Sequence, residues 1–64
     1  MRATYVFRYF NAQGCMIRMC MKQCDDERDA LRIAVADCGE CQRIQISTSG
    51  RIIWSGSLDE AAAA

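Results

Sequence analysis

The sequence contains no histidine, no proline and no long uncharged apolar run. The absence of histidine removes the commonest general base and metal ligand, and with it most hydrolase triads. No stretch approaches the ~18 apolar residues of a membrane span, so we expect no membrane partner. Arg2 and Arg8 interrupt the aromatic N-terminal run, so we expect no secretion signal there. Eight basic and eight acidic residues give a formal net charge of zero, which points to neither nucleic acid nor lipid.

The 64 residues are enough for one small domain. With 52% hydrophobic and 25% charged residues, the chain is not of the disordered type. A domain this small buries only about 60% of its unfolded surface, so a partner would add needed stability. The five cysteines are an odd number, which fits reduced thiols in the cytoplasm better than a closed disulfide framework.

Aromatic and β-branched residues over Thr4–Phe10 predict a strand. The segment Asn11–Gly14 has the composition of a type I turn with a bulge, and Cys15–Lys22 forms the second strand of a hairpin. Pairing Asn11 with Cys15 fixes the register of every pair beyond the turn. The inward face then holds Tyr5, Phe7, Tyr9, Ile17, Met19 and Met21, and the outward face holds Val6, Arg8, Phe10, Met16, Arg18 and Cys20.

A second hairpin is predicted from Gln42–Ser47 and Arg51–Ser55, joined by a turn over Ser47–Gly50. Pairing Ser47 with Arg51 sets the inward pairs of this hairpin. These are Ile46 with Ile52 and Ile44 with Trp54, while Arg43, Gln45, Ile53 and Ser55 face outward.

A helix is predicted over Asp25–Asp37, capped by Asp25 or Asp26 and ended by Gly39 in a left-handed conformation. Its apolar stripe consists of Ala30, Leu31, Ala34, Val35 and Cys38. Residues 58–64 are too short to hold a helix alone, so we expect a domain over residues 1–57 and a flexible C-terminal tail.

The predicted fold class is α+β: a two-layer ββαββ domain in which one helix covers one face of a four-stranded sheet of two hairpins. We favour the strand order 2-1-4-3, with the first and last strands central and parallel, because the helix then serves as the crossover between hairpins. An open meander is the alternative order.

The cysteines at positions 20, 24, 38 and 41 superficially have the spacing of a zinc site. The predicted helix separates Cys24 from Cys38 by roughly 20 Å, so we expect no metal site. Cys38 and Cys41 resemble the paired cysteines of thioredoxin-like proteins, but they close a helix instead of opening one, and Asp37 and Glu40 disfavour the thiolate. A redox switch that uses Cys38 and Cys41 is thus kept only as an alternative function. Cys15, Cys38 and Cys41 should share one end of the domain, where a disulfide could form in air.

The outward sheet face is predicted to be basic and free of acidic residues, with Phe10 among the cations. The cations are Arg8, Arg18, Lys22, Arg43 and Arg51. Arg8 directly opposite Arg18 is a like-charge pair that an anion would relieve. This face could bind single-stranded nucleic acid or an acidic protein, could form a homodimer, or could simply be a solvated surface.

We find no nucleophile–base pair and no glycine-rich phosphate loop, so we expect neither an enzyme nor a cofactor. The aromatic strand ending in Asn11–Gly14 and the acidic helix start at Asp25–Glu27, followed by Ala30, resemble a group of short bacterial proteins. The resemblance covers about residues 4–54. It implies a stand-alone cytoplasmic domain with no assigned activity. We predict a small interaction or accessory domain, homodimeric in one version of this hypothesis.

Overall fold

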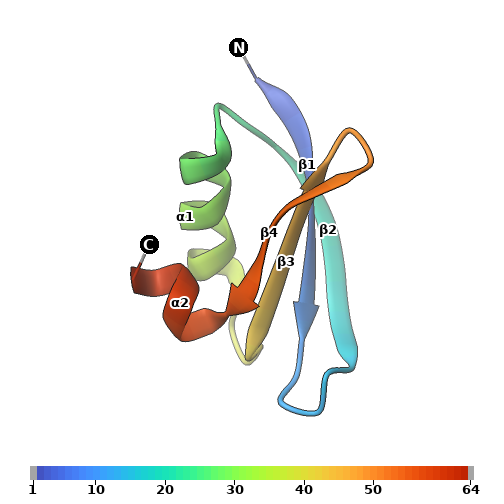
Figure 1. Ribbon diagram of the computed structural model, residues 1–64, viewed down its shortest axis with the longest axis vertical. Helices are drawn as coiled ribbons and strands as arrows, with labels where there is room; N and C mark the ends of the chain where they lie inside the picture. The colour runs from blue at the N-terminus through green and yellow to red at the C-terminus, as the bar shows by residue number, and fades with distance from the viewer. Residues whose placement is uncertain (1, 64) are drawn as a thin grey trace.

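The computed structural model describes residues 2–63, and it is an α+β domain with one open sheet of four antiparallel strands and two helices. Both helices lie on the same side of the sheet (Figure 1). The elements are β1 (Ala3–Phe10), β2 (Met16–Cys24), α1 (Glu27–Asp37), β3 (Arg43–Thr48), β4 (Arg51–Ser57) and α2 (Leu58–Ala63). Within residues 2–63, no helix has the length and apolar content needed to span a membrane.

The strand order is β2-β1-β3-β4, so the predicted order 2-1-4-3 is wrong. β1 and β3 are central and antiparallel, and β3 starts beside the end of β1 because the Gln42 N–H donates to the Phe10 carbonyl at 2.8 Å. Ile44 and Ile46 are almost fully buried, as expected of an interior strand. β4 contains Gly56, which weakens a strand interior and suits an edge.

The first turn and the ends of α1 follow the prediction. Gly14 N–H donates to the Asn11 carbonyl at 3.0 Å, and Gly14 and Gly39 both have positive φ. The Asp26 carboxylate accepts the Asp29 N–H at 2.8 Å and caps α1. The connection from β2 to β3 through α1 therefore begins and ends where the sequence indicates.

The structure places a second helix, α2, in the segment expected to be a flexible tail. Ser57 and Glu60 form a reciprocal capping box: the Glu60 N–H donates to Ser57 Oγ at 3.2 Å, and the Ser57 N–H donates to Glu60 Oε1 at 3.3 Å. Ala61 is 3% exposed within the core. The cap and this burial explain a helix that alanine propensity alone would not hold.

The core lies between the sheet and the two helices. Ala30 and Ala34 are fully buried, and their small side chains let α1 lie close to the aromatic side chains of β1. Phe7 and Tyr9 stack with ring centroids 6.5 Å apart. The buried set also includes Tyr5, Cys24, Cys38, Cys41, Ile44, Ile46 and Ala61.

The β3–β4 hairpin turns over two residues, Ser49 and Gly50, instead of the three that the predicted pair of Ser47 with Arg51 would leave. Thr48 pairs with Arg51, and both turn residues have positive φ, 53° for Ser49 and 76° for Gly50. Two left-handed residues make a type I′ turn, which matches the twist of a hairpin. Ser49 is the one non-glycine residue with positive φ among residues 2–63.

Ser49→Asn should stabilise the domain, because asparagine tolerates the left-handed region better than serine and creates the favoured Asn-Gly turn. We expect a gain of about 0.5 kcal/mol in the free energy of unfolding, measured by urea denaturation. Ser49→Ala is the matched control and should give no gain. Equal effects of the two substitutions would contradict the turn assignment.

Candidate interaction surface

β2 contains a bulge directly after the first turn. Phe10 pairs with Met16 as predicted, but Tyr9 pairs with Arg18, so Ile17 is an extra residue without a partner. Because side chains alternate along a strand, one extra residue moves every later side chain of β2 to the opposite face. The register predicted from the turn is therefore wrong from Ile17 onward.

This shift reverses the placement of the basic and apolar side chains of β2. Arg18 lies opposite the buried Tyr9, and Lys22 lies opposite Tyr5, so both cations lie on the helix side of the sheet. The predicted pair of Arg8 with Arg18 does not form, since Arg8 pairs with Met19. Met19 and Met21, predicted to be core residues, are 52% and 66% exposed.

β4 contains a second bulge, at Ile53. The predicted pairs of Ile46 with Ile52 and of Ile44 with Trp54 are wrong. Ile46 pairs with Trp54, Ile44 pairs with Gly56, and Ser47 pairs with Ile52. Ile52, predicted to be buried, is 61% exposed, whereas Ile53 packs against the core. Arg51 pairs with Thr48, the residue after Ser47, so its side chain points to the opposite side of the sheet from Ser47. Arg51 therefore lies on the helix side and not on the outward face where it was predicted.

The face of the sheet opposite the helices, which we call the uncovered face, has its exposed apolar side chains on the two edge strands, β2 and β4. On β1 the side chains of this face are those of Val6, Arg8 and Phe10, and their cross-strand partners define the rest of it. Their neighbours on this face are Met16, Met19, Met21, Arg43, Gln45, Ser47 and Ile52. Three methionines and one isoleucine are more than half exposed there, which exceeds the scattered apolar exposure of a monomer surface.

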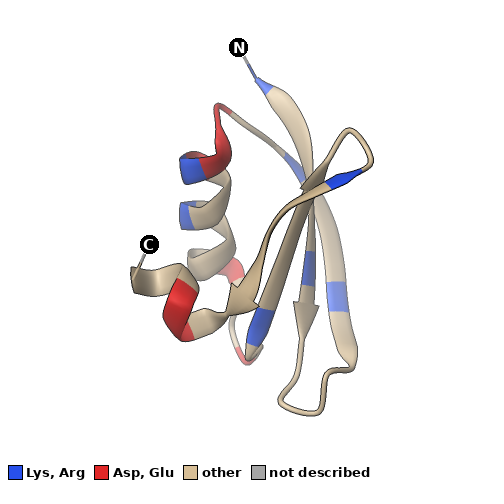
Figure 2. Cartoon of the chain, in the orientation of Figure 1, with Lys and Arg blue, Asp and Glu red and all other residues tan. Residues whose placement is uncertain are grey.

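Of the five predicted basic residues, only Arg8 and Arg43 lie on the uncovered face. Arg8 is half-buried, and its guanidinium donates to Ser47 Oγ at 3.0 Å. The acidic residues gather on the helices and the connections, and none lies on a strand (Figure 2). The predicted absence of acidic residues from this face is confirmed, but the predicted concentration of positive charge is not.

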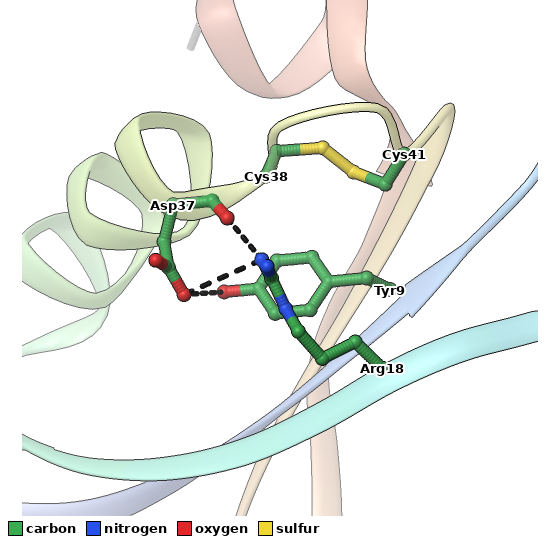
Figure 3. Close-up of a disulfide and its surroundings, with 5 residues drawn as sticks. All are labelled: Tyr9, Arg18, Asp37, Cys38 and Cys41. Carbon is green, nitrogen blue, oxygen red and sulfur yellow. Dashed lines mark hydrogen bonds and ion pairs between the residues drawn. A yellow bond between two sulfur atoms is a disulfide. The ribbon is translucent and has the colours of Figure 1, made fainter.

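The two cations on the helix side, Arg18 and Lys22, meet Asp37 at the end of α1, and Figure 3 shows the contact of Arg18. The Asp37 carboxylate lies 3.5 Å from both Arg18 Nη2 and Lys22 Nζ. It also accepts the Tyr9 hydroxyl at 3.4 Å. The Arg18 guanidinium lies over the Tyr9 ring, with Cζ 4.6 Å from the centroid. The Cys20 thiol is a fourth donor, with its sulfur 3.9 Å from the same oxygen. Four side chains from β1 and β2 therefore meet at one carboxylate of α1.

This cluster compensates an acidic residue at the negative end of a helix. The last turn of α1 has no basic residue of its own, and Arg18 also donates to the main-chain carbonyl of Asp37. Burial raises the pKa of the Tyr9 hydroxyl, and the nearby Cys20 and Asp37 raise it further, while Arg18 opposes them. No sequence signal marks this cluster, because only the bulge brings Arg18 and Lys22 to this side.

Cys38 and Cys41 form a disulfide that closes the connection from α1 to β3. Both are buried, at 3% and 1% exposure, whereas Cys15 is exposed and stands apart as a free thiol. Cys20 is half-buried and Cys24 is buried. The disulfide differs from the expectation of reduced thiols, but it joins two of the three cysteines among which a disulfide was predicted. Within residues 2–63, no three Cys, Asp or Glu side chains gather closely enough to hold a metal ion.

The chain matches no protein-family model, and neither the curated proteins nor the solved structures contain a significant match to it.

The disulfide predicts a defined thiol count. After unfolding without reductant, three thiols should react, and five after reduction. Removing Cys38 and Cys41 together by substitution with serine should lower the free energy of unfolding by about 2 kcal/mol, as expected for so short a closed loop. Cys15→Ser, at an exposed free cysteine, should change it by less than about 0.5 kcal/mol. Five reactive thiols before reduction would disprove the disulfide.

The raised pKa of Tyr9 predicts a loss of stability in alkali. The pKa of Tyr9 in the folded protein exceeds the unfolded value of about 10. Neutral Tyr9 therefore contributes fully to the free energy of unfolding below pH 10, and this contribution falls as the pH rises above 10. Tyr9→Phe removes this titration, so the free energy of unfolding of the variant should fall less between pH 9 and about 11. Tyr5 has a pKa raised by burial too, but it is present in both proteins and cancels. Parallel losses in both proteins would contradict the assignment.

Proposed function

We propose that this protein is an interaction domain, rather than an enzyme, and that two copies associate through the uncovered face. The observation that carries the proposal is the exposure of Met16, Met19, Met21 and Ile52, from 52% to 66%, on a side without helices. Methionine side chains are flexible and polarisable, and they adapt readily to an apolar partner surface. Covering them would remove apolar area from water and stabilise a domain too small to bury it alone.

The charge on the uncovered face supports a second copy as the partner. Only Arg8 and Arg43 lie there, and Arg8 is engaged by Ser47. Nucleic acid binds through several phosphate contacts from Lys and Arg side chains, which two cations supply poorly. In a twofold arrangement, the methionines on β2 of one copy pack against the uncovered face of the other. Arg43, at the end of β3, then points to the solvated rim.

The size of the face supports a concentration-dependent dimer. Four strands about 4.8 Å apart, each about seven residues long at about 3.3 Å per residue, cover roughly 20 by 23 Å. Two such faces bury about 900 Å² of flat area, and the relief of the side chains raises this towards the roughly 1,000 Å² of the smallest specific interfaces. An interface of this size is typical of weak, transient association, so we expect the dimer to form only at high protein concentration.

A redox function has less support. The sulfurs of Cys38 and Cys41 belong to residues that are at most 3% exposed, so a thiol of another protein does not reach them in the folded state. The disulfide instead acts as a clamp on the connection between α1 and β3. We therefore assign it a structural part in the interaction domain.

Sedimentation equilibrium over a range from micromolar to millimolar protein tests the proposal. The wild type should shift from 7.2 kDa towards twice that mass as concentration rises. Met21→Lys combined with Ile52→Lys should remain monomeric throughout, because each places a charge among the exposed apolar side chains of the contact. Both positions are exposed in the isolated chain, so the fold should be retained, which circular dichroism checks.

The matched control is Ala36→Lys, which adds the same charge at an exposed position of α1, away from the uncovered face. This variant should dimerise like the wild type. A wild type that stays monomeric at millimolar concentration would refute the proposal. So would a dimer that survives the Met21→Lys and Ile52→Lys substitutions.

A further inference from the structure

The helix side of the molecule contains a groove of about 540 Å³ that the proposed dimer does not use. α1 contributes Leu31 and Val35 to its walls, α2 contributes Ala61, and β4 contributes Trp54. The volume lies within the range of roughly 300–1,000 Å³ that is typical of small-molecule sites. The groove therefore has the size and the apolar walls of a ligand site.

Gly56 makes room for the indole that forms one wall. A Cβ at this position would lie 2.9 Å from Cη2 of Trp54, closer than real contacts allow, and 3.2 Å from Cζ2, which is tighter than most. The Trp54 ring therefore lies directly against the backbone of Gly56, two residues farther along β4. A flat aromatic surface held against the strand in this way is suited to an apolar ligand.

The rim of the groove is positively charged. Arg28 and Arg32 line it one helical turn apart, and Glu27 is the single acidic residue that lines it. Like charges at this spacing destabilise a helix slightly. Asp29 pairs with Arg32 at 2.5 Å, but Arg28 has no ion pair within the described part of the chain. An anion placed beside both guanidinium groups would relieve their repulsion and pair with Arg28.

We infer that this groove binds a small amphipathic anion, with its apolar body against Trp54 and Leu31 and its carboxylate between Arg28 and Arg32. The two arginines on the rim select a negatively charged head group, and the apolar walls contact the hydrocarbon part of the ligand. The inference is independent of self-association, because the groove and the uncovered face lie on opposite sides of the sheet.

Trp54 is the only tryptophan, so its fluorescence reports directly on the groove. The test titrates octanoate, octanol and octylammonium, which share one apolar body and differ in the charge of the head group. Octanoate should change the Trp54 emission saturably, and it should bind about tenfold more tightly than octylammonium. No saturable change with octanoate, or equal binding of octanoate and octylammonium, would overturn the inference.

Arg28→Gln combined with Arg32→Gln should weaken octanoate binding by about tenfold and leave octanol binding unchanged. Arg43→Gln combined with Arg51→Gln removes the same charge outside the groove, and should leave both affinities as in the wild type. Because Arg28 and Arg32 are exposed, their loss should not disturb the fold. Equal weakening by the two double variants would show that only net charge matters and would overturn the assignment of the head-group site.

The Met21→Lys and Ile52→Lys protein separates this result from the proposed dimer. Its uncovered face is altered, but its groove is intact, so octanoate should bind it as tightly as it binds the wild type. Loss of octanoate binding in this protein would place the ligand on the uncovered face and contradict the inference.

Discussion

A single extra residue in β2 determines which side chains this small sheet buries and which it exposes. Without the bulge at Ile17, Met19 and Met21 would lie under α1, and Arg18 and Lys22 would lie on the uncovered face. With it, the cations reach Asp37, where they offset an acidic residue at the negative end of α1. The methionines are displaced to the open side. The polar cluster on one side and the apolar surface on the other are thus two results of one irregularity in the sheet.

The parts of the fold that local chemistry dictates could be predicted from the sequence. The Asn11 turn, the Asp26 cap and the inward face of β1 follow from short-range patterns. The bulges could not be predicted, because neither Ile17 nor Ile53 is a residue type that marks one, and a register inferred from a turn continues without interruption. The strand order depends on contacts far apart in sequence. α2 had a readable signal, the spacing of Ser57 and Glu60, but its stability comes from the burial of Ala61.

The two candidate surfaces differ in what they could recognise, although both are apolar. The uncovered face extends over all four strands, which suits another sheet of the same shape. The groove beside Trp54 is enclosed by three elements and has cations on its rim, which suits a small anion. The basic surface expected from the sequence is thus divided: Arg18 and Lys22 serve the fold, Arg51 lies on the helix side, and Arg8 and Arg43 remain on the uncovered face.

β2 is an edge strand of nine residues without glycine or proline, and such an edge invites lateral growth into fibrils. The cations that Asp37 holds oppose this growth. If two copies of β2 paired antiparallel about Cys20, Arg18 of each copy would lie directly opposite Lys22 of the other. Two such like-charge contacts would form, one on either side of the centre. The two cations at the end of α1 therefore also disfavour this antiparallel pairing of the edge with a second copy.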